Sequence, residues 1–156
     1  MTKFAVFVST VFGIGDAPFA PGTVASLAAL PIGYLILLFG GAPYLLLVCL
    51  FVIGLGIWAS GLHAQSIGRD DPGSSAIDEV AGQFLAMLPL VPRGSTSDAI
   101  AVVAAFVLFR FFDIIKPWPI SRLERLAGGM GIMADDIAAG LVSAALLFGA
   151  LHWGLI

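Results

Sequence analysis

The chain has 156 residues, which is long enough for one domain and short for two. Hydrophobic residues make up 60% of it and charged residues 11%, and the mean hydropathy is +1.06. Soluble domains contain about 45–50% apolar residues, so the composition excludes an ordinary water-soluble protein and predicts an integral membrane protein. The formal net charge of −3 excludes a nucleic-acid-binding role, which requires a basic surface.

The first predicted elements are an N-terminal apolar stretch and two long apolar segments. Residues 1–15 combine Lys3 with an apolar run but lack a small-residue cleavage site, so we expect them to be retained and to lie on or dip into the membrane. Membrane-spanning helices need about 20 apolar residues. Residues 23–43, with a kink at Pro31, and residues 43–63, reached through a tight Gly-Ala-Pro turn, meet this requirement.

Three more apolar segments follow. Residues 79–92 are short and are expected to cross only partly, whereas residues 136–156 are uniformly apolar. Residues 98–116 end before Pro117, because proline disfavours helix in the residue before it. The pattern predicts an all-α fold: a polytopic integral membrane helical bundle of four to five spans, with short or re-entrant helices near the cytoplasmic face, forming a single domain over residues 1–156.

The basic residues are distributed unevenly along this predicted topology. If all five segments cross, one side of the membrane carries five of them: Lys3, Arg69, Lys116, Arg122 and Arg125. The other side carries only Arg93 outside the helices. The positive-inside rule places the richer side in the cytoplasm. Because most acidic residues lie on that side too, we expect a functional site that faces the cytoplasm.

Two motifs precede predicted helices on this side. In "PFAPGTVAS" (18–26), Thr23 follows Gly22 at a predicted helix start, where its hydroxyl can cap the helix and free N–H groups can bind a phosphate. In "GSSAIDEVAGQF" (73–84), Asp78 and Glu79 lie at the edge of the segment 79–92. Simple helix capping is the alternative interpretation of both motifs.

Two further motifs place charges beside apolar segments. In "FRFFDIIKPWPI" (109–120), Arg110, Asp113 and Lys116 lie on a helical arc about 120° wide. An internal Arg110–Asp113 ion pair, with Lys116 extended to the interface, is the alternative. In "GGMGIMADDIAAG" (128–140), a glycine-rich turn places Asp135 and Asp136 at the mouth of the last segment, where capping is again the alternative.

The motifs together predict an acidic site that binds a metal and a phosphate ester. Five carboxylates are candidate ligands, with the directly bound ones left open: Asp78, Glu79, Asp113, Asp135 and Asp136. Like charges about 4 Å apart repel by about 4 kcal/mol at an effective dielectric constant of 20, and an all-oxygen cluster suits Mg²⁺. Arginine and lysine beside such a metal suit a phosphate ester. No Ser-His-Asp arrangement is recognisable in the sequence.

The same four motifs also carry a family resemblance. "APGTVASL", "DEVAGQF", "FRFFDIIKPWPI" and "GGMGIMADDIAAG" closely resemble, in order, the signature segments of bacterial phosphatidylglycerophosphatase A over residues 12–145. Members of this family are magnesium-dependent inner-membrane phosphatases that convert phosphatidylglycerophosphate to phosphatidylglycerol. The resemblance implies that activity for this chain, with Mg²⁺ as cofactor, a membrane phospholipid as substrate, and a multi-pass position in the bacterial inner membrane.

Residue roles follow from the motifs and the resemblance together. Four residues are expected to be catalytic: Glu79, Arg110, Lys116 and Asp136. The phosphate-binding set shares the two basic residues and adds Gly22 and Thr23. The oligomeric state stays open.

The main alternative is a small ion or proton transporter, because buried acids also mark ion paths. The apolar far halves of the long segments argue against it. A non-catalytic assembly subunit would not need this set of charges, and the pattern of CDP-alcohol synthases is not found.

Overall fold

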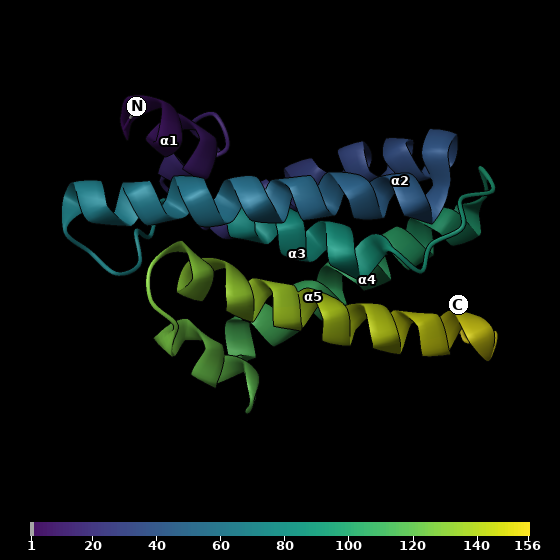
Figure 1. Cartoon of the computed structure of the whole chain (residues 1–156). Helices are drawn as coiled ribbons and strands as arrows, with labels where there is room; N and C mark the ends of the chain where they lie inside the picture. The colour runs from purple at the N-terminus through teal and green to yellow at the C-terminus, as the bar shows by residue number, and fades with distance from the viewer. Residues whose placement is uncertain (1) are drawn as a thin grey trace.

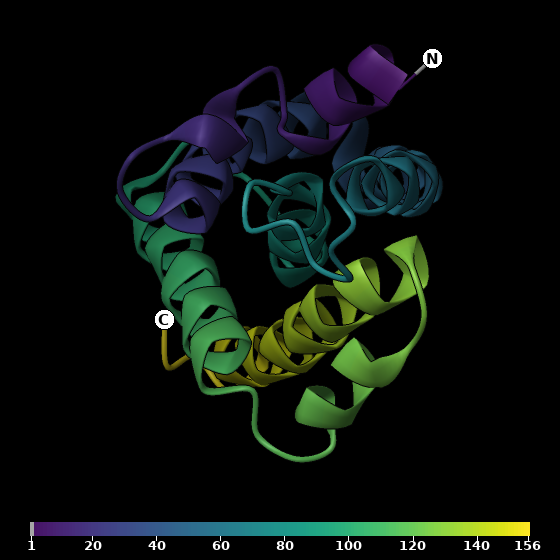
Figure 2. The ribbon, with the colours of Figure 1, turned by 90° about the vertical axis from the view of Figure 1, so that its left-hand side faces the viewer.

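The computed structural model describes residues 2–156, whose regular secondary structure is entirely helical, so the all-α class is confirmed. In chain order the elements are α1 (Thr2–Ser9), η1 (Ile14–Asp16), α2 (Pro21–Ile67), α3 (Ile77–Met87), α4 (Thr96–Ile115), η2 (Ile120–Arg125) and α5 (Gly129–His152). The long helices run side by side in Figure 1, and the view along them in Figure 2 shows α3 enclosed by the others. The short α3 is therefore the centre of the bundle.

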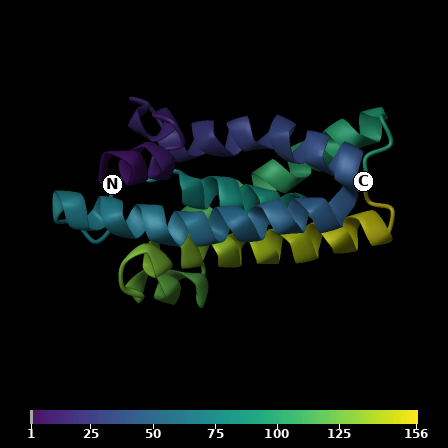
Figure 3. The same ribbon diagram turned by 45° about the horizontal axis from the view of Figure 1, so that its top comes forward.

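Helix α2 contains 47 residues and folds back on itself. Gly41 has a φ of 72° and a ψ of −177°, which interrupt the helix at a conformation that glycine tolerates. In Figure 3 the blue chain runs to one end of the molecule and returns beside itself. The two arms match the predicted segments 23–43 and 43–63 and their Gly-Ala-Pro turn. Backbone angles stay helical at Pro31, and the helix is interrupted at Gly41.

The expected number of membrane spans is met only in part. Among the described residues, two helices are long and apolar enough to cross a bilayer, namely α2 and α5. Helix α3 has 11 residues, about 16 Å, which is too short for a hydrocarbon core of about 30 Å. Helix α4 has 20 residues, but its three charged residues, Asp98, Arg110 and Asp113, distinguish it from the two apolar helices.

The central helix α3 touches α5 backbone to backbone. A Cβ atom added to Gly140 would lie 2.5 Å from the carbonyl oxygen of Gly82, so only glycine fits at this contact. Phe84 and Met87 of α3 and Phe109 of α4 fill the surrounding core, and each is at most 2% exposed. The close contact brings the acidic residues of α3 and α5 to the same end of the bundle.

The opposite end of the bundle is held by Asp98. Its Oδ2 accepts hydrogen bonds from the hydroxyl of Tyr34 at 2.8 Å and from the backbone N–H groups of Arg93 and Gly94 at 2.7 and 2.8 Å. Asp98 also forms a capping box with Ser95. These bonds tie the first arm of α2 to the start of α4 at the end where the C-terminus lies (Figure 1).

Candidate active site

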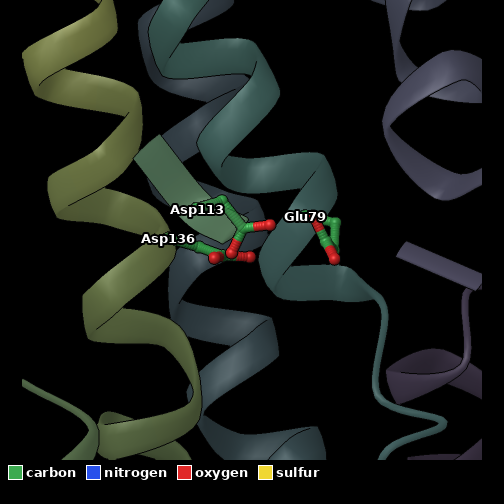
Figure 4. Close-up of side chains that lie close together, drawn as sticks. All are labelled: Glu79, Asp113 and Asp136. Atoms are coloured by element: carbon green, nitrogen blue, oxygen red, sulfur yellow. The ribbon is translucent and has the colours of Figure 1, made fainter. Parts of the chain in front are cut away.

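Three carboxylates from three different helices meet at the end of the bundle where α1 lies. Glu79 of α3, Asp113 of α4 and Asp136 of α5 each offer an oxygen within 4.8 Å of the other two. Figure 4 shows Asp113 and Asp136 facing one another, with Glu79 beside them on α3. Asp113 and Asp136 are only 7% and 3% exposed. The structure thus brings together three of the five predicted metal ligands.

Arg110 supplies positive charge to this cluster. Its Nη1 contacts a carboxylate oxygen of Glu79 and lies 2.9 Å from Oδ2 of Asp113. The intrahelical ion pair considered from the sequence is therefore present, but it extends to a second helix. The Nε atom of Arg110 is buried and has no hydrogen-bond partner within the described chain. One guanidinium thus joins α4 to α3.

Lys116 forms its ion pairs outside the cluster of three carboxylates. It is the C-cap of α4 and has a left-handed conformation with φ of 45°. Its Nζ contacts Glu124 of η2 and lies 2.6 Å from Oδ2 of Asp135. Burial opposes the charge of Lys116, but the hydrogen bonds to Asp135 and Glu124 outweigh it and raise the lysine pKa. Glu124 belongs to no recognisable motif, so the sequence alone does not predict its contact with Lys116.

Asp135 and Asp136 lie deeper in α5 than the sequence predicts. The helix begins at Gly129, so these aspartates lie in its second turn rather than at its mouth, and helix capping does not explain them. Asp136 joins the cluster of three carboxylates, whereas Asp135 faces Lys116. Adjacent residues on a helix point about 100° apart, which explains the division.

A cavity of about 350 Å³ opens beside the carboxylates. Its lining includes eight acidic residues: Asp70, Asp71, Asp78, Glu79, Asp113, Glu124, Asp135 and Asp136. Lys116 is the single basic residue that lines it, within the part of the chain that the structure describes. Buried Oδ1 atoms of Asp78 and Asp135 have no hydrogen-bond partner among residues 2–156. The cavity therefore favours a bound cation.

The acidic residues of α3 titrate unusually because of this crowding. Burial, followed by the charge of Asp113, raises the pKa of Glu79 to about 7, although Arg110 opposes the shift. Burial and the charge of Glu79 raise the pKa of Asp78 as well. Protonation is thus one way in which the site reduces its repulsion, and a bound cation is another.

The start of α2 approaches Glu79 but does not line the cavity. The helix begins at Pro21 with Ala20 as its N-cap, so Thr23 is not the cap, contrary to the prediction. A Cβ atom on Gly22 would lie 1.7 Å from Oε1 of Glu79, and the Ser26 hydroxyl donates to Oε2 at 3.3 Å. Gly22 is explained by this close approach. Phosphate binding by Gly22 and Thr23 stays a prediction.

The fold and the site together define an all-α protein. At one end of its apolar helical bundle, a cluster of carboxylates lies beside an arginine and a lysine. A family model described as Phosphatidylglycerophosphatase A matches residues 7–151. The chain belongs to this family, and it is accordingly a phosphatase. The predicted resemblance is confirmed.

Three relatives are similar over most of their lengths. Phosphatidylglycerophosphatase A of Escherichia coli (strain K12) is 42% identical over 146 residues, which are 92% of this chain and 82% of that protein. The Haemophilus influenzae protein of the same name is 37% identical over 92% of this chain and 86% of its own. A putative phosphatidylinositol-3-phosphatase of Bacteroides thetaiotaomicron is 39% identical over 91% and 90%. No solved structure matches the chain.

Proposed function

We propose that this protein is a Mg²⁺-dependent membrane phosphatase that hydrolyses phosphatidylglycerophosphate to phosphatidylglycerol and inorganic phosphate. The observation that carries the proposal is the meeting of Glu79, Asp113 and Asp136 from three helices beside Arg110. Two relatives named phosphatidylglycerophosphatase A, at 42% and 37% identity, support the substrate. Membership in a phosphatase family disfavours the transporter alternative.

The donor set fits a magnesium ion. Mg²⁺ prefers carboxylate oxygens at about 2.1 Å, so opposite ligands of one ion lie about 4.2 Å apart. The three oxygens of Glu79, Asp113 and Asp136 lie within 4.8 Å of one another, which is close to that span. When bound, the ion supplies Lewis-acid polarisation of a phosphoryl oxygen and a water of lowered pKa.

The basic residues of the chain bind and orient the phosphate. We assign Arg110, which touches the cluster through Nη1, to the phosphoryl oxygens, because its guanidinium presents its donors as a planar, directional fork. Lys116 reaches the cavity from the end of α4 and adds a positive charge to the outer phosphate oxygens. Glu79 and Asp136 complete the proposed catalytic set: both carboxylates would hold the ion, and Glu79 also orients Arg110.

We also propose a multi-pass position in the bacterial inner membrane, with the site facing the cytoplasm. Large apolar side chains on the outer faces of four helical stretches are more than 55% exposed: Phe39 and Phe51 in the arms of α2, Val103 and Val107 in α4, and Phe148 in α5. Apolar surface of this extent is typical of contact with lipid. The acidic site lies at the end that carries most of the basic residues, as the positive-inside rule requires of the cytoplasmic side.

Phosphate release from lipid substrates tests the proposal. Purified protein in mixed micelles is supplied with phosphatidylglycerophosphate or, because of the Bacteroides relative, with phosphatidylinositol 3-phosphate. We expect faster release from phosphatidylglycerophosphate, loss of release in EDTA, and recovery with added Mg²⁺. Full turnover after exhaustive EDTA treatment would contradict the metal, and a preference for phosphatidylinositol 3-phosphate would contradict the substrate.

A further inference from the structure

A buried chain of hydrogen bonds leads from the interior to the wall of the acidic cavity. Ser9 Oγ of α1 lies 2.9 Å from Nδ1 of His63 and 3.1 Å from Oγ of Ser75, and Ser60 Oγ lies 2.9 Å from the same Ser75 oxygen. Ser9 and Ser60 are fully buried and His63 is 4% exposed. Ser75 lines the cavity beside the carboxylates. The chain of bonds therefore ends at the proposed substrate site.

Backbone hydrogen bonds fix the position of Ser75. The N–H of Ala76 donates to the carbonyl oxygen of Ser9 at 2.9 Å, and the N–H of Ser75 donates to that of Pro72 at 2.7 Å. Ser75 stands two residues before the start of α3 at Ile77. Its hydroxyl is thus held in place by α1, α2 and its own loop, immediately before the acidic turn of α3.

The hydrogen bonds around Ser75 decide whether its hydroxyl can donate to a substrate. A hydroxyl has one proton to donate and two lone pairs that accept. Ser9 donates its proton to Ser75, so it accepts from His63, whose Nδ1 must carry hydrogen. Either hydroxyl of the Ser60–Ser75 pair can be the donor. When Ser60 donates, both lone pairs of Ser75 are occupied, and its own proton has no acceptor within residues 2–156 while the residue lines the cavity.

We propose that Ser75 binds substrate by donating this hydrogen bond to an anionic oxygen of the lipid head group. Ser9, Ser60 and His63 are then positioning residues that keep the proton of Ser75 turned towards the cavity. Eight carboxylates and one lysine line the cavity. The Ser75 hydroxyl is neutral, so it can donate to an anionic oxygen without changing the net charge of the cavity. This inference rests on the proposed function, because it names a further contact of the same site.

The test compares Ser75→Ala with two matched variants in the mixed-micelle assay with phosphatidylglycerophosphate. Ser75→Ala is expected to raise KM, expressed as surface mole fraction, by about tenfold to a hundredfold, the range for a lost hydrogen bond to a charged group. Its kcat should change less than about threefold, since the contact is a binding one. Ser75→Thr keeps the hydroxyl and should stay within about threefold of the wild type in KM.

The neighbouring Ser74→Ala variant is the control. Within residues 2–156 the Ser74 side chain makes no hydrogen bond, and it does not line the cavity, so its KM should not change. A double-mutant cycle tests the positioning residues: Ser9→Ala should raise KM alone but add nothing to Ser75→Ala. Melting temperatures of all variants show whether a loss reflects unfolding.

Several results would overturn the inference. A wild-type KM in Ser75→Ala, an equal change in Ser74→Ala, or additive effects of Ser9→Ala and Ser75→Ala would each do so. A fall in kcat of more than about a hundredfold at unchanged KM would assign Ser75 to the chemical step and also contradict it. If the wild-type protein releases no phosphate from either lipid, the proposed function itself fails. If the wild type is active and one of the contradicting results is obtained, only the proposed role of Ser75 fails.

Discussion

Arg110 joins two carboxylates that belong to different helices. It contacts Glu79 of α3 and lies 2.9 Å from Asp113 of its own helix. An arginine presents a planar fork of donors, whereas a lysine presents a compact point charge on a flexible stem. The residue is therefore suited both to hold the two carboxylates and to meet a phosphate.

Replacing Arg110 with lysine keeps the charge and removes the fork. We expect Arg110→Lys to fold but to lose about a hundredfold to a thousandfold in turnover, the size of one lost contact to a developing oxyanion. Phosphate release and thermal unfolding of the same preparation measure the two effects. Arg93→Lys, at the other end of the bundle, is the control and should keep wild-type turnover. Poor folding with normal specific activity would make Arg110 a structural residue only.

Asp113 is the carboxylate that faces both Asp136 and Arg110. The Asp113→Asn substitution removes one negative charge and keeps the shape, so the affinity for Mg²⁺ should fall. We expect the Mg²⁺ concentration for half-maximal phosphate release to rise at least about tenfold, since hard cations depend on ligand charge, with activity partly restored by excess metal. Asp16→Asn, exposed in η1 and outside the cavity, should leave the requirement unchanged. An unchanged requirement in Asp113→Asn would remove Asp113 from the ligand set.

At the scale of elements, the contact between α3 and α5 sets the relative position of the acidic residues. Gly140→Ala would place a Cβ atom 2.5 Å from the Gly82 carbonyl oxygen, and a backbone atom cannot rotate away. Overpacking of this kind costs about 1–3 kcal/mol, so we expect a lower melting temperature and reduced activity. Gly149→Ala, whose nearest neighbour would be Trp153 at 3.7 Å, should not destabilise. Equal melting temperatures for the two variants would show that the helices separate easily.

Helix positions could largely be predicted from the sequence, but the start of α5 could not. The segment 98–116 agrees with α4, and the arms and turn of α2 also agree. Glycines in "GGMGIM" predict a turn because glycine disfavours helix. In the fold, Cβ atoms on Gly129 and Gly131 would lie 1.9 Å and 2.0 Å from the carbonyl oxygens of Ile57 and Leu126. These glycines are required by close packing, which no local pattern reveals.

The candidate site could be predicted where its residues share a short motif. Arg110 and Asp113 lie one turn apart, and the acidic pairs stand beside apolar segments. The pairing of Lys116 with Glu124 depends on the left-handed residue that ends α4, a detail that apolar patterning does not contain. Ser9 meets His63 and Ser75 across 54 and 66 positions of sequence. Contacts of that separation follow from the tertiary fold alone.

At the scale of the whole molecule, the distribution of charge predicts the orientation. Asp70 is exposed at the end that holds the carboxylates, and Ser97 is exposed at the opposite end. The single native cysteine, Cys49, is fully buried and should not interfere with labelling. In intact cells, an impermeant thiol reagent should label a Ser97→Cys variant and leave Asp70→Cys unlabelled until the cells are opened. The reverse pattern would place the site outside the cytoplasm.

The carboxylates lie at one end of the bundle rather than at its middle, and this has a consequence for lipid traffic. In the membrane position proposed above, a head group that meets them from that end would keep its acyl chains in the adjoining leaflet throughout the reaction. Hydrolysis would then release phosphate into the water on the side from which the lipid came, and the dephosphorylated lipid would stay in its original leaflet. The proposed reaction thus requires neither an aqueous passage through the bundle nor a step that turns the lipid over.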